Sequence, residues 1–540
     1  MKKIDANFLK PSQQQLNSLL KYYQTGRYID AEKLSLSITQ EFPKYQFGWK
    51  VLAAVLWKLG KKNESLDICQ KSLQLAPNDS EAHNNLGVIL QQLDRLIESE
   101  ASFRQAITLK PNYVEAHINL GNTLKKKGSL KEAEASFRQA ITLKPDYAEA
   151  HNKLGVILNQ LDRSSESEAS FRQAIKLKPN YAEAHSNLGN TLKEQASLKE
   201  AEASFRQAIT LKPDLAVAHY NLGNTLKERG KLKEAEASFR QAITLKLDYT
   251  EAHINLGNTL QEQDRLKEAE ASFRQAITLK PDLAVAHYNL GKVYKKIRKN
   301  SKAVECFEKT LELSSEDLLG ATLQLATLGK RKIPEKTPEN FMQEFYRKKS
   351  KNWDKLEKKE NKYRGHLLIK NAFKTTHSTS KKIDILDMGC GTGSLAKILR
   401  PYARTLVGVD LSPDMLFKAE EICLYDSLYK KDLSQYLSEV SNHYDTIVAA
   451  AVLIHFYDLS NIFFLVKDSL KINGKFIFSI FEETEKNKDL NSFLMYAHSD
   501  DYITTLADSL NLKIIYRQKD IHEYHKGVSV PAIIYVLEKK

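Results

Sequence analysis

The 540-residue sequence lacks features that mark several classes of protein. Its four cysteines are scattered without C-x-x-C spacing, so neither a disulfide framework nor a metal site is predicted. The opening residues lack the apolar centre of a signal peptide. The most apolar long run, YDTIVAAAVLIHFYDLSNIFFLV, is interrupted by Asp445, His455 and Asp458 and is too polar to span a bilayer. We therefore expect a cytoplasmic protein without a membrane segment.

The formal net charge of +14 is unevenly distributed along the chain. Between Arg347 and Lys382 the sequence has thirteen basic and three acidic residues. Such a segment is typical of a solvated linker, and a surface for phosphate or acidic groups is the alternative. With 42% hydrophobic and 27% charged residues, the whole chain has the composition of globular proteins. Nucleic acid is therefore not the partner that we expect.

The strongest pattern in the sequence is a 34-residue repeat. The heptamer ASFRQAI begins at Ala101, Ala135, Ala169, Ala203, Ala237 and Ala271. Looser copies extend the period to about nine units between residues 13 and 318. In one unit, Ala116, Leu120 and Leu124 share a helical face. Gly128 then marks a turn, and Pro145 ends a second helix, so each unit is predicted to be a helical hairpin.

These packing positions resemble the tetratricopeptide repeat, whose helical hairpins stack into an α-solenoid. The aromatic residue that opens each repeat in that family is Trp49 in the second copy. Histidine replaces it in the next seven copies, at His83, His117, His151, His185, His219, His253 and His287. Leu247 replaces the expected proline in one copy. Because the histidines lie one whole repeat apart, we interpret them as packing or capping residues.

The first helix of each hairpin, which lines the concave groove in this family, carries a recurring asparagine. This asparagine ladder consists of Asn85, Asn119, Asn187, Asn221, Asn255 and Asn289. Packed helices lie about 10 Å apart, so one amide would meet about every third residue of an extended peptide. An amide offers a donor and an acceptor, so the ladder could bind a peptide backbone with little regard to sequence. The groove of O-linked N-acetylglucosamine transferases is similar; inheritance through recent repeat duplication is the alternative.

The sequence changes character after a short terminal helix and the connector KRKIPEKTPENF. A basic helical stretch, FMQEFYRKKSKNWDKLEKKENKYRGHLLIKNAF, leads to the strand-like segments IDILDM, TLVGVD, YDTIVAA and KFIFSIF, which alternate with helical segments. LKIIYRQ and AIIYVLE are the last predicted strands. This alternation predicts a Rossmann-like α/β fold, a mostly parallel sheet with helices on both faces. We divide the chain into a repeat array at 13–318, a capping helix and linker at 319–340, and an α/β domain at 341–540.

A glycine-rich stretch, DMGCGTG, follows the first predicted strand, where ligands bind in such sheets. Gly389, Gly391 and Gly393 let the backbone turn tightly and approach a ligand. Dinucleotide binding needs G-x-G-x-x-G, but the sixth position is Ser394, which favours S-adenosylmethionine instead. Asp410 ends the next strand, where an acid can accept hydrogen bonds from ribose hydroxyl groups.

Four motifs occur in the order typical of class I S-adenosylmethionine-dependent methyltransferases: DMGCGTG, GVDLSPDML, KKDL and YDTIVAAAVLIHF. The region also resembles predicted bacterial methyltransferases that carry tetratricopeptide repeats. In KKDL, Asp432 follows the third strand and is placed to meet the adenine amino group. By this resemblance the cofactor site would comprise Asp387, Gly389, Cys390, Gly391, Gly393, Asp410, Leu411, Met415, Asp432 and Leu433. Relatives often have an acid where this chain has Ala451, so the acceptor side is harder to predict.

Methyl transfer from a sulfonium is an in-line displacement, which needs a base only if the acceptor must lose a proton. His455 is the first candidate for that base, Tyr496 and His498 are second candidates, and a structural role is the alternative for each. We expect an S-adenosylmethionine-dependent methyltransferase whose repeats bind a protein or peptide partner, which can be the substrate. The alternatives are a small-molecule methyltransferase whose repeats serve assembly, and an interaction scaffold with an inactive methyltransferase-like domain.

Overall fold

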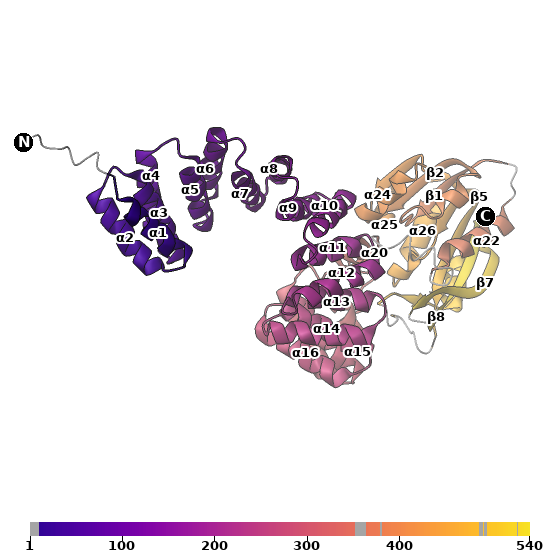
Figure 1. Cartoon of the computed structure of the whole chain (residues 1–540). Coiled ribbons are helices and arrows are strands. Elements are labelled where there is room, and N and C mark those ends of the chain that lie inside the picture. Colours follow the sequence, from indigo (N-terminus) through magenta and orange to yellow (C-terminus); the bar gives the residue numbers. More distant parts are fainter. Residues whose placement is uncertain (1–9, 351–362, 378–380, 485–489, 491–493, 526–527) are drawn as a thin grey trace, which may run out of the picture. The chain divides into compact units, whose positions relative to one another are not determined.

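The computed structural model describes residues 10–350, 363–377, 381–484, 490, 494–525 and 528–540. The chain forms two compact units, Met1–Gln263 and Asp264–Lys540. Figure 1 colours the chain along its sequence and labels the elements. None of the helices in the described ranges has the length and apolar character needed to cross a membrane. All four cysteines are free thiols.

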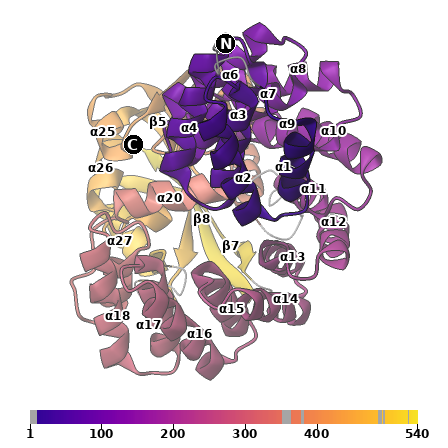
Figure 2. The same cartoon turned by 60° about the vertical axis from the view of Figure 1, so that its left-hand side comes forward.

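The first unit consists of helical hairpins that follow one another along the chain (Figures 1 and 2). Its helices are α1 (Gln13–Gln24), α2 (Tyr28–Glu41), α3 (Gln46–Lys58), α4 (Lys62–Leu75), α5 (Ser80–Gln92), α6 (Leu96–Leu109), α7 (Val114–Lys126), α8 (Leu130–Leu143), α9 (Ala148–Gln160), α10 (Ser164–Leu177), α11 (Ala182–Glu194), α12 (Leu198–Leu211), α13 (Ala216–Glu228), α14 (Leu232–Leu245) and α15 (Thr250–Glu262). The second unit begins with α16 (Leu266–Leu279), α17 (Ala284–Lys296), α18 (Asn300–Leu313) and α19 (Ala321–Thr327). This order confirms the predicted α-solenoid.

A close contact between a glycine and a phenylalanine joins the two helices of a hairpin. In the hairpin of α7 and α8, a Cβ atom on Gly121 would lie 2.8 Å from the ring of Phe137. Phe137 is fully buried with Ala133 and Ala140 in the same core cluster. The same contact recurs at Gly87, Gly155, Gly189, Gly223 and Gly291. Glycine is therefore needed where the helices cross, because any larger residue would displace the ring.

The recurring histidines cap backbone carbonyl groups, as predicted. Nε2 of His117 lies 2.9 Å from the carbonyl oxygen of Pro111. Trp49 makes the equivalent bond, since its Nε1 donates to the carbonyl oxygen of Pro43 at 2.9 Å. The same bond to a proline six residues earlier forms at His83, His151, His185, His219 and His287. An imidazole N–H therefore takes over the hydrogen bond of the indole N–H.

The second unit contains a sheet in the order β3-β2-β1-β4-β5-β8-β7. Its strands are β1 (Ile383–Met388), β2 (Ala403–Asp410), β3 (Ser427–Lys430), β4 (Tyr444–Ala449), β5 (Leu470–Glu482), β7 (Leu512–His525) and β8 (Val528–Lys539), and β6 (Ala497–His498) pairs with β5. Strands β1 to β5 pair in parallel, whereas β8 is antiparallel to both β5 and β7. The strand order reverses between β1 and β4, which is where α/β sheets bind ligands.

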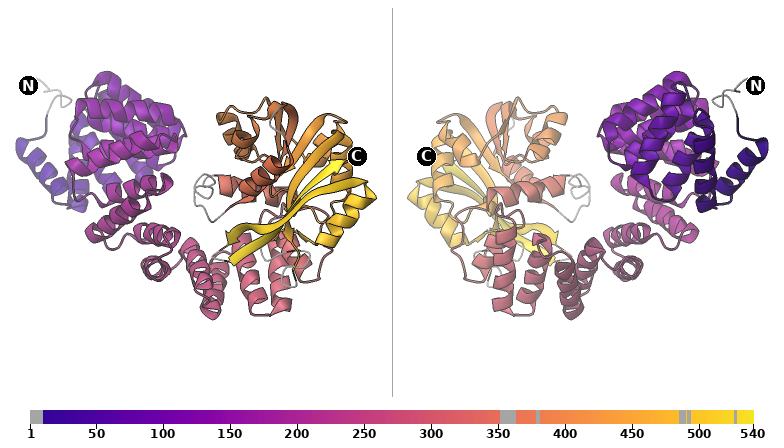
Figure 3. Two further views of the ribbon diagram at one scale, coloured as in Figure 1. Left: turned by 90° about the vertical axis from the view of Figure 1, so that its right-hand side faces the viewer. Right: turned by 90° about the vertical axis from the view of Figure 1, so that its left-hand side faces the viewer.

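Helices cover both faces of this sheet (Figure 3). Helices α25 (Leu433–Ser438), α26 (Ser460–Ser469) and α27 (Asp500–Ser509) contribute to the core on one face, and α22 (Gly365–Thr376) and α23 (Ala396–Leu399) to the core on the other. Neighbouring strand residues divide between the faces: Leu386 belongs to the first core and Ile385 to the second. This arrangement confirms the predicted Rossmann-like α/β class.

Three details of the second unit differ from the predicted segments. β3, the strand expected before Asp432, has only four residues and no strand-like segment of its own in the sequence, and β6, with two residues, is not among the predicted strands. The helix after the glycine loop has only four residues because turns occupy much of the preceding segment. The basic helical stretch forms α20 (Glu339–Ser350) and α22, while residues 351–362 between them lie outside the described residues. The domain boundaries given above remain predictions.

Candidate cofactor site

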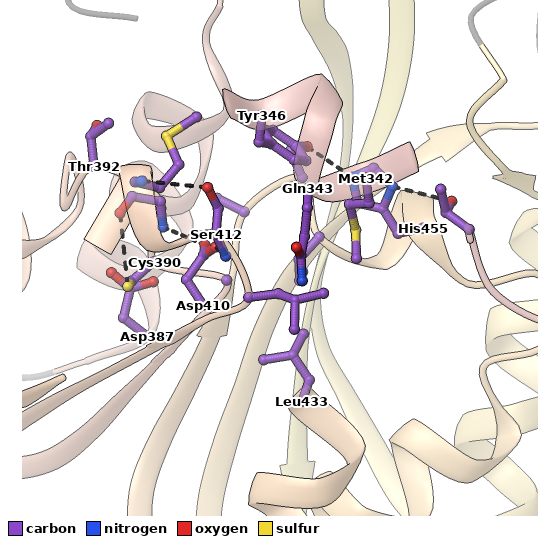
Figure 4. A pocket seen from close by; sticks show the side chains of 18 of the residues that line it. Met342, Gln343, Tyr346, Asp387, Cys390, Thr392, Asp410, Ser412, Leu433 and His455 are labelled. Carbon is purple, nitrogen blue, oxygen red and sulfur yellow. Dashed lines mark hydrogen bonds between the residues drawn. The ribbon is translucent and has the colours of Figure 1, made fainter. Parts of the chain in front are cut away.

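A pocket lies at the carboxyl ends of β1, β2 and β4, where the order of the strands reverses. The glycine loop, the turns after β2 and β4, and the connector with α20 all contribute to its lining. Figure 4 shows Asp387 and Asp410 on one side of the pocket and Met342, Gln343 and Tyr346 of α20 on the other. The predicted cofactor loop therefore faces residues of α20, the helix that follows the connector.

Asp410, at the end of β2, holds the glycine loop. Its two carboxylate oxygens accept hydrogen bonds from the backbone N–H groups of Gly391 and Ser412, both at 2.8 Å. The three loop glycines have φ angles of 71°, 56° and 80°, in the left-handed region that favours glycine. Apart from its two chain neighbours, none of the described residues has an atom within 4 Å of the place where a Cβ of Gly391 would be. A ligand can therefore approach the bare backbone of this loop closely.

Asp387 adds a second buried carboxylate to this side of the pocket. Burial, together with the nearby carboxylate of Asp410, raises the pKa of Asp387 to about 7. The hydroxyl of Tyr425 donates to Asp387 Oδ2 at 2.6 Å and partly opposes that shift. Burial also raises the pKa of Asp410, although backbone N–H donors act in the other direction. A ligand with a positive charge or with hydroxyl donors would favour the ionised form of both acids.

Asp432, the first residue before α25, has contacts on both carboxylate oxygens. Oδ1 accepts hydrogen bonds from the backbone N–H groups of Ser434 and Gln435 at 2.9 and 3.3 Å, which makes Asp432 the N-cap of α25. Oδ2 accepts from Nζ of Lys336, in the connector, at 2.9 Å. Burial opposes ionisation of Asp432, but Lys336 and the backbone donors hold its pKa below the usual range.

His455, the first candidate for a general base, lines the pocket but is buried between two hydroxyl groups. Nε2 lies 2.8 Å from the hydroxyl oxygen of Tyr346, and Nδ1 lies 3.3 Å from Oγ1 of Thr337. Burial, reinforced by the charge of Lys349, lowers the pKa of His455 to about 3. A histidine with so low a pKa is a weak base at neutral pH. We interpret His455 as a residue that positions Tyr346 and Thr337, and its role as a base remains a prediction that this geometry disfavours.

Most of the predicted cofactor residues line this one pocket. These residues are Asp387, Gly389, Cys390, Gly391, Asp410, Leu411, Met415, Asp432 and Leu433. Gly393 is not part of the lining, and a Cβ there would lie 2.5 Å from Ile422, which indicates a packing role. Tyr496 and His498 are also outside the lining: Tyr496 donates to the carbonyl oxygen of Pro334 at 2.8 Å, and His498 is buried in β6.

The connector, α20 and the residues around the start of α22 supply pocket residues that the sequence reasoning did not identify. These are Lys336, Thr337, Met342, Gln343, Tyr346, Tyr363 and His366. In the sequence, the many lysines of this region are more conspicuous than the spacing of its apolar residues. Met342 and Tyr346 stand four residues apart on one half-buried face of α20, and this spacing is the signal that indicates such a face.

The asparagine ladder lies in the first helices of the hairpins, where several amides bond to the neighbouring repeat. Nδ2 of Asn119 donates to Oδ1 of Asn84 at 3.1 Å, and Nδ2 of Asn255 donates to Oδ1 of Asn224 at 2.8 Å. Asn85, Asn119, Asn187, Asn221 and Asn255 are half-buried, whereas Asn289 is buried. One hollow in the first unit is lined by Lys193, Asn224, Lys227, Glu228, Asn255 and Glu262. The ladder thus has a structural role and also borders a polar hollow.

Family models match both parts of the chain. Residues 352–512 match a methyltransferase domain. Residues 121–162, 165–196 and 223–264 match a TPR repeat, and residues 68–101, 182–215 and 248–316 match tetratricopeptide repeats. The chain is therefore an array of tetratricopeptide repeats followed by a methyltransferase domain.

Curated proteins similar to this chain include methyltransferases of two organisms. A probable S-adenosylmethionine-dependent methyltransferase of Saccharomyces cerevisiae is 29% identical over 145 residues, which cover 25% of this chain and 50% of that protein. A malonyl-[acyl-carrier protein] O-methyltransferase of Acetivibrio thermocellus is 29% identical over 144 residues, which cover 26% of this chain and 49% of that protein. The chain spans about half the length of these relatives. S-adenosylmethionine is the cofactor expected of this domain.

Solved structures of repeat proteins resemble parts of the chain. YrrB, described as a TPR protein with an unusual peptide-binding site, is 24% identical, and the alignment covers 34% of this chain and 95% of that one with a TM-score of 0.30. The APC/C hetero-tetramer Cut9-Hcn1 is 17% identical, with 52% of this chain and 55% of that chain covered and a TM-score of 0.39.

Proposed function

We propose that this chain transfers the methyl group of S-adenosylmethionine to an acceptor, and that its repeats bind a protein or peptide partner that can carry the acceptor. The observation that supports the transfer is the pair of hydrogen bonds that Asp410 accepts from the backbone N–H groups of Gly391 and Ser412. These bonds hold a glycine loop that lines the pocket and has open space beside Gly391. When bound, S-adenosylmethionine supplies an activated methyl group on a sulfonium. The protein contributes binding and orientation.

The pocket residues fit such a cofactor chemically. Asp387, Asp410 and Asp432 would accept hydrogen bonds from its ammonium, hydroxyl and adenine donors. Met342 and Tyr346 would limit the access of water from the side of α20. Because a sulfonium carries a positive charge, the buried carboxyl groups of Asp387 and Asp410 would stabilise the ligand in their ionised forms.

An oxygen acceptor is the first class to test. His455 is neutral and contacts two hydroxyl groups, so the site is better suited to an acceptor that needs no proton removed, such as a carboxylate. The name of one relative, malonyl-[acyl-carrier protein] O-methyltransferase, also indicates an oxygen acceptor carried by a protein. An extended peptide bound in the repeat groove would raise the local concentration of such an acceptor.

Calorimetric titration of the full chain with S-adenosylmethionine and S-adenosylhomocysteine tests the proposal. Binding at micromolar concentration, followed by transfer of a labelled methyl group to carboxylate probes, is the expected result. A methyl ester would lose its label on mild alkaline treatment, whereas a methylated amine would keep it. A folded chain that binds neither compound would favour the scaffold interpretation.

Cofactor affinity should depend on pH through Asp387. Its pKa of about 7 in the free protein means that the carboxyl is partly protonated at neutral pH. A cationic ligand favours the carboxylate, so affinity should rise by about tenfold from about pH 6 to about pH 8, with proton release near pH 7. Calorimetry in buffers of different ionisation enthalpy measures that release. Asp387→Asn should flatten the profile, and an unchanged profile would assign the titration to another group.

The asparagine ladder should contribute most of the affinity for extended peptides. We expect alanine at Asn119, Asn187, Asn221 and Asn255 together to weaken, by at least about tenfold, the binding of peptides selected from a random displayed library against the wild-type chain. The control replaces one exposed lysine in the second helix of each of the same four hairpins, namely Lys131, Lys199, Lys233 and Lys267. Equal binding by both variants, with unchanged thermal unfolding, would leave the ladder without a peptide-binding role.

A further inference from the structure

We propose that the connector carries an autoinhibitory latch, in which Lys336 occupies the carboxylate oxygen of Asp432 that the adenine amino group of the cofactor would use. This inference rests on the proposed function, because it concerns the cofactor pocket. It assigns to a segment outside the matched methyltransferase domain, residues 352–512, direct control over cofactor affinity.

The latch follows from the way in which Asp432 is already bonded. Oδ1 is committed to the start of α25, since it accepts the N–H groups of Ser434 and Gln435. Oδ2 is the oxygen that remains for a ligand, and it accepts Nζ of Lys336 at 2.9 Å. An ammonium is a stronger donor to a carboxylate than a neutral amino group is. Lys336 also lines the pocket, so the lysine and an adenine would compete for one oxygen.

The backbone around Lys336 is fixed to the turn after β4. The N–H of Thr337 donates to the carbonyl oxygen of His455 at 2.8 Å, and Tyr457 donates to the carbonyl oxygen of Glu335 at 2.8 Å. Lys336 itself forms an isolated antiparallel bridge with Phe456. Because these bonds hold the main chain, the side chain of Lys336 can leave Asp432 without unfolding the connector. Opening the latch is therefore a side-chain movement.

The same connector leads back to α19, the capping helix that follows the repeats. Leu323 of α19 is buried in one cluster with Leu494 and Tyr496, and Ile333 and Phe341 of the connector pack against this cluster. If a bound partner shifted α19, the movement would therefore pass to Lys336 through this short packed segment. Such a shift would change cofactor affinity, because withdrawal of the Lys336 ammonium would free Oδ2 of Asp432 for the adenine amino group.

The ion pair of Lys336 and Asp432 is partly exposed, which sets the size of its expected effect on cofactor affinity. The side chains of Lys336 and Asp432 are 52% and 25% exposed, so solvent screens the ion pair only in part. Measured energies of exposed pairs are small, and partly buried ones are larger. We expect the latch to reduce cofactor affinity by about two- to fivefold.

The test is calorimetric titration of the full chain with S-adenosylhomocysteine, comparing the wild type with Lys336→Met. The variant should bind about two- to fivefold more tightly. Raising the salt from about 0.05 to about 0.5 M should strengthen binding by the wild type and leave the variant unchanged, because salt screens the latch. Lys431→Met is the matched control: Lys431 adjoins Asp432 in sequence, pairs with Glu439 and does not line the pocket, and its loss should leave affinity unchanged.

Each other outcome is decisive. Weaker binding by Lys336→Met would make Lys336 a cofactor ligand and overturn the latch. Equal binding by the variant and the wild type would show that adenine and Lys336 do not compete, and would also overturn it. If the wild type and both variants are folded but none binds S-adenosylhomocysteine, the proposed function itself fails, and the latch falls with it.

Discussion

Replacing Asp410 with alanine should reduce the affinity for S-adenosylhomocysteine by at least about 100-fold. The carboxylate holds the N–H groups of Gly391 and Ser412 at 2.8 Å and is placed to accept ribose hydroxyl groups. Alanine would remove both contacts at once and leave the loop N–H groups without their acceptor. Losing charged hydrogen bonds of this kind costs about 1.5 to 3 kcal/mol each, which accounts for the expected loss.

Calorimetry of the full chain measures this effect, and thermal unfolding shows whether the variant folds. Asp414→Ala is the matched control, because Asp414 lies in the first turn of the next helix, α24 (Pro413–Glu421), and does not line the pocket. It should bind as the wild type does. If Asp410→Ala kept wild-type affinity, the cofactor would have to bind outside this pocket.

Replacing Gly389 with alanine should have the second largest effect. Gly389 has a φ of 71°, and a Cβ atom there would lie 2.6 Å from Cγ2 of Val452. The new methyl group would therefore both strain the backbone and push the loop away from the turn after β4. We expect about 2 kcal/mol less stability and about 30-fold weaker binding of S-adenosylhomocysteine.

A second substitution separates the steric effect from the backbone strain. In the double variant Gly389→Ala with Val452→Ala, the colliding side chain is shortened, so part of the lost stability and affinity should return. Thermal unfolding and calorimetry are measured on the wild type, on Gly389→Ala and on the double variant. A single Gly389→Ala variant that is as stable as the wild type and binds normally would show that the loop can move without consequence.

The sequence predicts the fold because each element carries its own local pattern. The 34-residue period fixes the hairpins, and Gly121 and Phe137 occupy the positions at which the helices cross. The cofactor loop is also local, since the glycines directly follow a strand and Asp410 ends the next one. Most of the predicted cofactor residues consequently line one pocket.

The contacts of the connector and of α20 could not be predicted in the same way, because they join segments far apart in the chain. Lys336 and Asp432 are 96 residues apart, and Tyr346 and His455 are 109 residues apart. No periodic pattern encodes such a pair. The burial that lowers the pKa of His455 is equally invisible in the sequence, where a histidine after the fourth strand indicates a base.

The contacts between glycine and phenylalanine in the repeats affect how the number of repeats can change during evolution. Six hairpins share the same crossing, and neighbouring copies carry the same ASFRQAI segment. Because the copies are nearly interchangeable, unequal exchange between them would add or remove one 34-residue unit while creating no new kind of interface. Each unit would lengthen or shorten the groove by about 10 Å, or roughly three residues of an extended peptide. The reach of the array can therefore evolve independently of the chemistry in the methyltransferase domain.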